Sequence, residues 1–267
     1  MTLVTDSSFF VSETERAMEV SELKMLDFNT KTIREIALEM PQTIRVFEDL
    51  KIDYCYGGRR SLAEACQTAG VEPDILSEKL KSAVSESEDA RPERQSASEL
   101  IDYIIAKHHV FTVDEIQRLT ALMNKVCGKH GPQHTELFQL RDVFEEMDED
   151  MLFHMNKEEE ILFPYIKRLD KAAQSNCVPL MPPFGTVRNP IRMMMKEHDS
   201  AADQFREMRQ ITEDYSLPPD ACPSFKGLYA GLQDLEKDLH RHVHLENNVL
   251  FPCSQELEKQ VFELTSQ

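Results

Sequence analysis

Two eleven-residue segments, beginning at His154 and His242, repeat one pattern, H-x-x-x-E-x-x-[IV]-L-F-P. In each copy a histidine precedes a glutamate by four residues, and these glutamates are Glu158 and Glu246. On an α-helix this spacing puts both side chains on one face, one turn apart. Two such helices facing each other would bring two imidazoles and two carboxylates together inside a bundle, which begins a metal site. A surface ion pair has the same spacing, but the recurrence of the whole pattern 88 residues later (242 − 154) disfavours it.

Two metal ions need further ligands, which must come from the other two helices of a bundle. A turn predicted at Gly131-Pro132 lies 22 to 23 residues before His154 (154 − 132 and 154 − 131). An antiparallel neighbour joined by that turn therefore reaches the same height near residues 108–110. His108 and His109 both satisfy this condition, and helical facing does not separate them.

The fourth helix supplies His198, the only histidine on the segment predicted to begin at Pro190. The apolar Met194, one turn earlier, indicates that His198 faces inward. His130 and His134 lie at the turn itself, roughly 30 Å from His154 at about 1.5 Å per residue. We therefore interpret them as surface residues and exclude them as ligands.

Other nearby candidates fail on spacing. His240 and His244 flank His242, but neither lies four residues before Glu246. Glu159 and Glu160 follow Glu158 at about 100° and 200° around the helix, so they point elsewhere. The remaining donors are imidazoles and carboxylates without thiolate, which suits iron, and manganese less well. Two glutamates on facing helices favour a carboxylate-bridged pair of non-haem iron ions with a bridging oxo or hydroxo group, whereas zinc would be tetrahedral.

The rest of the chain reads as helices separated by Gly and Pro, so we predict an all-α fold. Capping-box patterns begin at Thr32, Ser61, Ser96 and Thr112, and the last of these predicts that the helix axis breaks or bends near Phe111. We predict a flexible extension over 1–24, a small helical N-terminal domain over 25–84, a linker over 85–95 and a four-helix bundle over 96–260. Pro164 and Pro252 occupy the same offset in the two repeats and predict matching kinks, at about 3 kcal/mol or more each unless the context absorbs them.

Composition limits the class of partner. The 267 residues carry 48 acidic and 30 basic side chains, for a net charge of −18, which disfavours nucleic acid and anionic lipid. No apolar run approaches the roughly 20 residues that span a bilayer, and the first residues lack the pattern of a secretory signal. Six scattered cysteines form no C-x-x-C pair. We therefore expect a cytoplasmic protein without nucleic-acid or membrane partners.

Two parts of the sequence together resemble the iron-sulfur cluster repair di-iron proteins, the RIC family. D-Y-C-Y-G-G at 53–58, followed by S-L-A-E-A, is similar to the family's small N-terminal domain. H-x-x-x-E-E-x-I-L-F-P, K-E-H-D and H-x-x-x-E-N-N-V-L-F-P are similar to its hemerythrin-like domain. The family usually has a second cysteine where Tyr56 stands here, which puts vicinal-dithiol chemistry in doubt and leaves a single-thiol role for Cys55.

The resemblance implies a ligand set and a function. Its iron ligands correspond to His109, His154, Glu158, His198, His242 and Glu246. It implies repair of iron-sulfur clusters damaged by nitrosative or oxidative stress, through iron donation, reduction of nitric oxide at the di-iron centre, or both. Proteins with damaged clusters, nitric oxide and oxygen are then the partners, and the chain forms a homodimer. The alternative is a hemerythrin-like protein that binds or senses oxygen, nitric oxide or iron without turnover.

Overall fold

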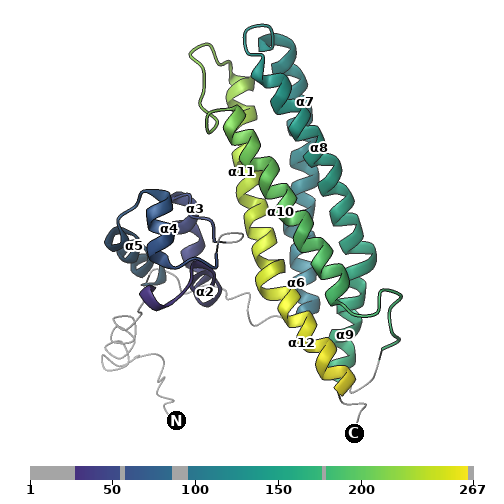
Figure 1. Ribbon diagram of the computed structural model, residues 1–267. Helices are drawn as coiled ribbons and strands as arrows, with labels where there is room; N and C mark the ends of the chain where they lie inside the picture. The colour runs from purple at the N-terminus through teal and green to yellow at the C-terminus, as the bar shows by residue number, and fades with distance from the viewer. Residues whose placement is uncertain (1–27, 55–57, 86–95, 176–178, 264–267) are drawn as a thin grey trace, which may run out of the picture. The chain divides into compact units, whose positions relative to one another are not determined.

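The computed structural model describes residues 28–54, 58–85, 96–175 and 179–263 (Figure 1). The chain forms two units, residues 1–89 and 90–267. The extension predicted over 1–24, nearly all of the linker predicted over 85–95, and Cys55 lie outside the described residues. Helices make up both units, and the described residues contain a single isolated bridge between Thr32 and Ser61 in place of any sheet. The all-α prediction is confirmed.

The N-terminal unit is a small cluster of short helices around its own apolar core. Thr32 and Ser61 each accept a hydrogen bond from the backbone N–H three residues later, and the glutamate there bonds back to the cap. Both capping boxes were predicted. Gly70, with φ of +67°, ends one helix in the left-handed conformation that glycine tolerates best. The helices are α2 (Ile33–Glu39), α3 (Ile44–Asp49), α4 (Leu62–Ala69) and α5 (Pro73–Ser85).

The second unit is a bundle of four long antiparallel helical rods (Figure 1). Three of the rods are α-helices joined end to end through a short π-helical turn, so each continues without interruption. The first rod runs from α6 (Ala97–Ile104) through η4 (Ile105–His109) to α7 (Val110–His130). The second runs from α8 (Glu136–Lys157) through η5 (Glu158–Leu162) to α9 (Phe163–Ser175), and the third is α10 (Arg188–Ile211). The fourth runs from α11 (Pro223–Leu245) through η6 (Glu246–Leu250) to α12 (Phe251–Glu263).

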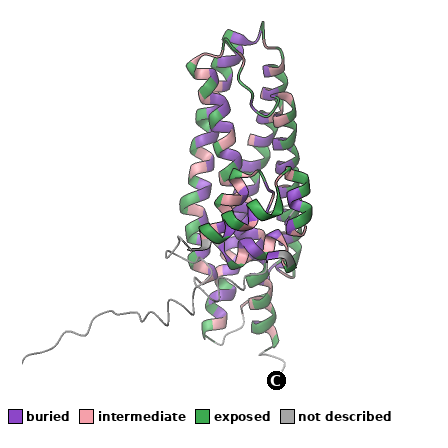
Figure 2. Ribbon diagram, turned by 90° about the vertical axis from the view of Figure 1, so that its left-hand side faces the viewer, coloured by how far each residue is buried: buried purple, intermediate pink, exposed green. Residues whose placement is uncertain are grey.

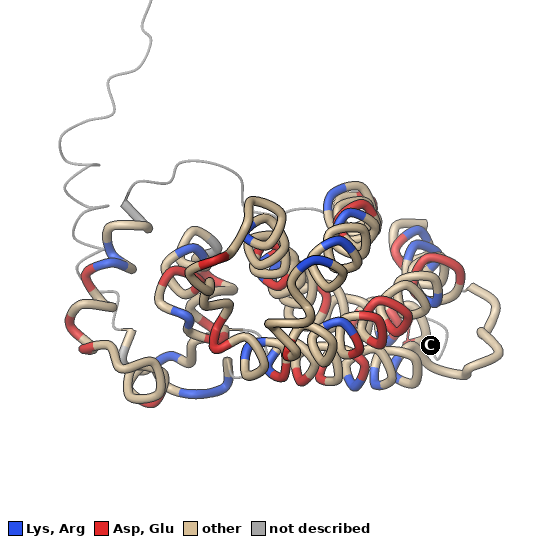
Figure 3. The backbone as a smooth tube through the Cα atoms, turned by 90° about the horizontal axis from the view of Figure 1, so that it is seen from above, with Lys and Arg blue, Asp and Glu red and all other residues tan. Residues whose placement is uncertain are grey.

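The rods present an apolar stripe to one another and a polar surface outward. Figure 2 shows buried residues recurring along one side of each helix of the bundle. Figure 3 shows Lys, Arg, Asp and Glu spread along the same helices. Helix α7 packs against α11, α8 against α10, and α9 against α12 and α6. None of the described helices has both the length and the apolar content to cross a membrane.

The helix does not break near Phe111, although the first of the two predicted alternatives required a break there. Thr112 is buried inside α7, which runs through this position without a new cap. The irregularity lies just upstream, in η4, where the Val110 N–H donates to the carbonyl of Ile105, five residues back. Tertiary burial of Thr112 therefore overrides the local capping pattern.

The prolines of the two repeats follow π turns of identical placement. In η5 the Phe163 N–H donates to the Glu158 carbonyl, and in η6 the Phe251 N–H donates to the Glu246 carbonyl. A proline within an α-helix clashes with the carbonyl four residues back and has no N–H to donate. The wider turn just before Pro164 and Pro252 accommodates both defects, so the expected irregularity takes the form of a π turn.

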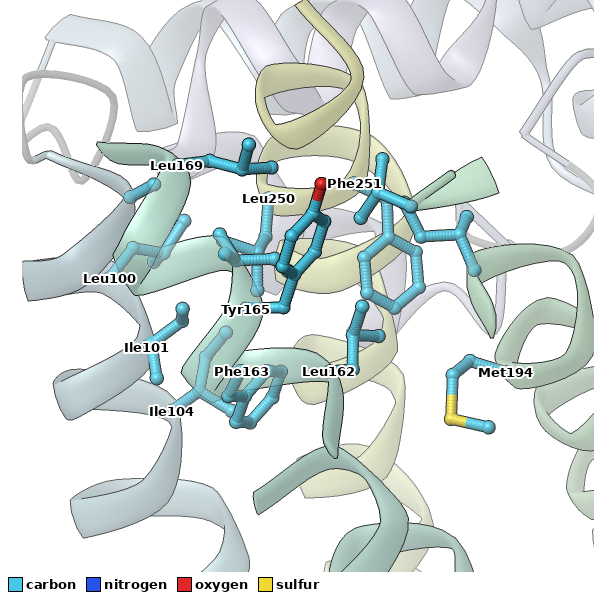
Figure 4. Close-up of a cluster of buried hydrophobic side chains, with 14 of the residues drawn as sticks. Leu100, Ile101, Ile104, Leu162, Phe163, Tyr165, Leu169, Met194, Leu250 and Phe251 are labelled. Carbon is cyan, nitrogen blue, oxygen red and sulfur yellow. The ribbon is translucent and has the colours of Figure 1, made fainter. Parts of the chain in front are cut away.

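The Leu-Phe pairs that end the repeats anchor a core cluster next to these turns (Figure 4). Leu162, Phe163, Leu250 and Phe251 are all at most 1% exposed. Burial of one such side chain contributes roughly 1.5–3 kcal/mol. They pack with residues of α6 and α10, including Leu100, Ile101, Ile104 and Met194. The core thus fixes the ends of the segments that carry the repeated His and Glu.

Candidate metal centre

All six side chains selected from the sequence converge inside the bundle. They are at most 2% exposed and come from all four rods: His109, His154, Glu158, His198, His242 and Glu246. Their ligand atoms form two groups, and within each group the atoms lie within 4.8 Å of one another. The groups are His109, Glu158, His242, Glu246 and His154, Glu158, His198, Glu246.

Both carboxylates belong to both groups. Glu158 lies between His109 and His154, with Nε2 to carboxylate-oxygen distances of 3.6 and 3.4 Å. Glu246 lies between His242 and His198 at 2.9 and 3.1 Å. Each glutamate therefore presents one oxygen to each group, which is the arrangement that a bridging carboxylate requires.

The arrangement of the donor atoms is better explained by cations between them than by hydrogen bonds among them. The Nε2 atoms of His109 and His242 face each other at 3.1 Å, and those of His198 and His154 face each other at 3.0 Å. Both carboxylate oxygens of Glu158 are buried and make no hydrogen bond among the described residues. Buried carboxylate oxygens without partners are costly unless a cation neutralises them. The residues present therefore fit a pair of metal ions held by nitrogen and oxygen.

Acceptors on neighbouring helices orient three of the four imidazoles. The Nδ1 atom of His109 bonds to Glu159 at 2.7 Å, and that of His154 bonds to Glu197 at 2.8 Å. In the same way, Nδ1 of His198 bonds to Asn247 at 3.1 Å. Partners of this kind fix the ring and turn its other nitrogen toward the metal.

Sequence reasoning missed these three acceptors. Each directly precedes or follows a candidate ligand, in the pairs Glu158-Glu159, Glu197-His198 and Glu246-Asn247. An adjacent residue lies about 100° around the helix, toward the neighbouring rod rather than the bundle axis. Acceptor residues next to ligands were the signal that could have found them.

The structure separates His109 from His108. His108 is also buried, but its Nδ1 bonds to Asp238 at 3.0 Å and it belongs to neither group. His244 likewise pairs with Asn248 at 2.8 Å. His130, expected at the surface, is only 6% exposed and packs against Phe225 at a ring distance of 5.3 Å. That expectation is wrong because the turn at the end of α7 is covered by the start of α11.

The buried charges of the site compensate one another. Burial alone would lower the pKa of His154, but Glu158 beside it, followed by Glu197, raises that pKa to about 10. Burial also disfavours the ionised form of Glu246, yet His242 and His198 hold its pKa well below the usual range. His242 is fully buried, and burial lowers its pKa. In the metal-free protein, a proton on His154 thus offsets part of the carboxylate charge, and a metal would displace that proton.

A cavity of about 570 Å³ between α8 and α10 adjoins the site. His154 forms part of its wall, as do Lys157 and Glu197, which pair with each other. Phe153 and Met193, which are 65% and 56% exposed, line its outer part. Two phenylalanine rings pack against ligand imidazoles. Phe163 stacks on His109 at 5.7 Å and Phe251 on His198 at 6.2 Å.

Fold and site together define a hemerythrin-like bundle, and comparisons with known proteins agree. Residues 100–254 match the family described as hemerythrin HHE cation binding domain. Residues 29–84 match a domain of unknown function, DUF542. The two matches correspond to the bundle and to the helices of the N-terminal unit.

Full-length relatives cover both parts. The iron-sulfur cluster repair protein YtfE of Yersinia pseudotuberculosis is 29% identical over 228 residues, 85% of this chain and 97% of the relative. The iron-sulfur cluster repair protein ScdA of Staphylococcus haemolyticus is 30% identical over 224 residues, 84% and 97% of the two chains. ScdA of Staphylococcus epidermidis is 29% identical over 222 residues, 82% and 95%. The chain belongs to this family of iron-sulfur cluster repair proteins.

Proposed function

We propose that this protein repairs damaged iron-sulfur clusters with a non-haem di-iron centre. His109 and His242 would hold one iron, and His154 and His198 the other. Glu158 and Glu246 would bridge both, together with an oxo or hydroxo group. The observation that carries the proposal is the sharing of both carboxylates between two histidine groups. The names of the relatives supply the repair role.

The donor set favours iron among the common metals. Each group offers two imidazoles and two carboxylates and contains no thiolate, which suits iron and disfavours copper(I) or a structural zinc site. A pair of irons in such a site would supply reversible one-electron changes and open positions for a diatomic molecule. The residues around it hold the ligands in place, through the acceptors at Nδ1 and the rings of Phe163 and Phe251.

Two properties of the surroundings support exchange with solution. The cavity between α8 and α10 has His154 in its wall, and it would bring nitric oxide or oxygen next to this ligand. Glu197 in the cavity wall pairs with Lys157, and it also hydrogen-bonds to Nδ1 of His154. Rearrangement of this pair would loosen one ligand, as iron donation to a damaged cluster requires.

The family and the net charge of the chain also support a proposal about its localisation, oligomeric state and partners. We propose a cytoplasmic homodimer whose partners are proteins with damaged iron-sulfur clusters, with nitric oxide and oxygen as small ligands. The net charge of −18 disfavours nucleic acid as a partner. A thiol role for Cys55 remains part of the proposal, with Tyr56 replacing the second cysteine of the family's motif.

Two assays on iron-loaded, reduced protein under anaerobic conditions test the proposal. In the first, a hydro-lyase with a peroxide-damaged [4Fe–4S] cluster is incubated with the protein, and recovery of its activity is measured. In the second, nitric oxide is added and nitrous oxide is measured in the headspace. Glu158→Leu is the site-dependent control and should fail in both assays. Activity in neither assay, with nitric oxide bound but not consumed, would instead indicate a binding or sensing protein without turnover.

A further inference from the structure

A second cluster of metal-ligating side chains lies at the far end of the bundle. It comprises His130 at the end of α7, His134 in the following turn, and Asp220 in the connection before α11. One ligand atom from each lies within 4.8 Å of the others. Nε2 of His134 is 3.1 Å from Asp220, and Nδ1 of His130 is 3.8 Å from it.

This cluster is separate from the central site. His130 follows His109 by 21 residues (130 − 109) along one rod, which corresponds to roughly 30 Å at about 1.5 Å per residue. It shares no residue with either central group. Neither of the repeated motifs contributes to it, and the function proposed above does not use it.

The two imidazoles are held in position before any ligand arrives. The ring of Phe225 packs against His130 at 5.3 Å and against His134 at 5.6 Å. Glu136 accepts from Nδ1 of His134 at 3.1 Å, which directs the other nitrogen toward Asp220. Such a carboxylate behind a histidine is the usual companion of a metal-binding imidazole.

The nitrogen of His130 that faces Asp220 does not hydrogen-bond to it. The side chain of His130 is only 8% exposed, and the nitrogen that it turns toward Asp220 is Nδ1. The distance from its Nδ1 to Asp220, 3.8 Å, is too long for a hydrogen bond. A cation between this Nδ1 and the Asp220 carboxylate would bring the two groups into one ligand set without requiring them to contact each other. Asp220 itself is 58% exposed, so an ion can enter from solvent.

We infer that His130, His134 and Asp220 form a second metal site that takes one divalent transition ion, with zinc as the best match. Two imidazoles and a carboxylate are ligands that zinc accepts in tetrahedral sites, and a water molecule would complete the set. The ion would link the turn after α7 to the connection before α11. The two ligands that it would join there, His134 and Asp220, are 86 residues apart in the sequence. Its role would be to clamp this end of the bundle.

Zinc titration of the iron-loaded full chain tests the inference, because iron occupies the central site. After dialysis, metal analysis should give one more zinc per chain for the wild type than for His134→Ala or Asp220→Asn, with iron unchanged. Glu213→Gln removes an exposed acid from the same connection and should keep the additional zinc. The difference between wild type and variants stays interpretable even if the central site also takes zinc.

Two further readouts separate a built site from binding at exposed side chains. Cobalt(II) in place of zinc should give the strong visible absorption of a tetrahedral site in the wild type and in Glu213→Gln only. Zinc should raise Tm of the same two proteins and leave the other two unchanged. Equal zinc binding by all four proteins, or no additional zinc in the wild type, would overturn the inference and leave only hydrogen bonds and ion pairs there.

Discussion

Replacement of a bridging carboxylate should affect both metals at once, whereas replacement of a histidine should affect one. Glu158 and Glu246 each belong to both groups, so Glu158→Leu takes one of four protein ligands from each ion. His154 belongs to a single group, so His154→Ala takes one ligand from one ion. We expect two irons per chain in the wild type, one or none in Glu158→Leu and Glu246→Leu, and one in His154→Ala.

The expected loss of metal affinity can be bounded from the effect of substitutions that remove only a residue behind a ligand. Loss of a residue that only orients a ligand lowers metal affinity by roughly 10–100-fold, or about 1.4–2.7 kcal/mol. Loss of a ligand itself must exceed this, and for a bridge it applies to both ions. The metal-free protein should respond in the opposite direction. Leucine replaces a fully buried carboxylate without leaving a fixed charge, since the histidines can become neutral, so Tm of the metal-free variant should equal or exceed that of the wild type.

The assay is metal analysis after anaerobic iron loading and desalting, with thermal unfolding of the metal-free proteins in parallel. Glu160→Gln is the matched control, because Glu160 lies exposed in the same π turn and belongs to neither group. It should keep two irons. Two irons in both leucine variants, or equal loss in the Glu160 control, would refute the shared-carboxylate interpretation.

Three further predictions concern packing, capping and a thiol. Phe163→Ala removes a buried ring that stacks on His109 and should lower the free energy of unfolding by about 3–5 kcal/mol, measured by denaturant titration. Ser61→Ala should destabilise the N-terminal unit by about 1 kcal/mol and leave iron content unchanged, because the cap belongs to that unit alone. The backbone N–H of Phe225 at the start of α11 and the His130 ring lower the pKa of Cys222 to about 7. The alkylation rate of Cys222, measured by mass spectrometry of peptides, should therefore rise as pH increases through 7. Cys127 is the control, because burial raises the pKa of its thiol and it should stay unreactive. Equal rates at the two thiols would contradict this prediction.

The central histidine-glutamate repeat was accessible from the sequence because helical spacing and duplication encode it directly. Helical periodicity did not choose between His108 and His109, which only the family resemblance did, because periodicity extrapolated from Ile101 assumes α-helical turns throughout. Seven residues beyond Ile101 is His108, but the π turn η4 inserts one residue and brings His109 to that position. Only the three-dimensional structure reveals this turn, which no local sequence signal marked.

The other differences arise from contacts between elements distant in sequence. The capping pattern at Thr112 is a local signal that the packing of α7 against α11 overrides. His130 is buried because Phe225, 95 residues later (225 − 130), covers it. Glu197 reaches His154 from another rod, and such pairings depend on the rotation of each helix about its axis. Single-helix periodicity fixes the inward face but not these cross-helix partners.

The central claim, a pair of irons bridged by Glu158 and Glu246, is tested most directly by Mössbauer spectroscopy with metal analysis on the protein as isolated. We predict two high-spin non-haem irons per chain whose spins are coupled to each other. The quadrupole doublets should remain without magnetic splitting in a weak applied field at low temperature. One iron per chain, or two irons that behave as isolated paramagnets, would contradict the account.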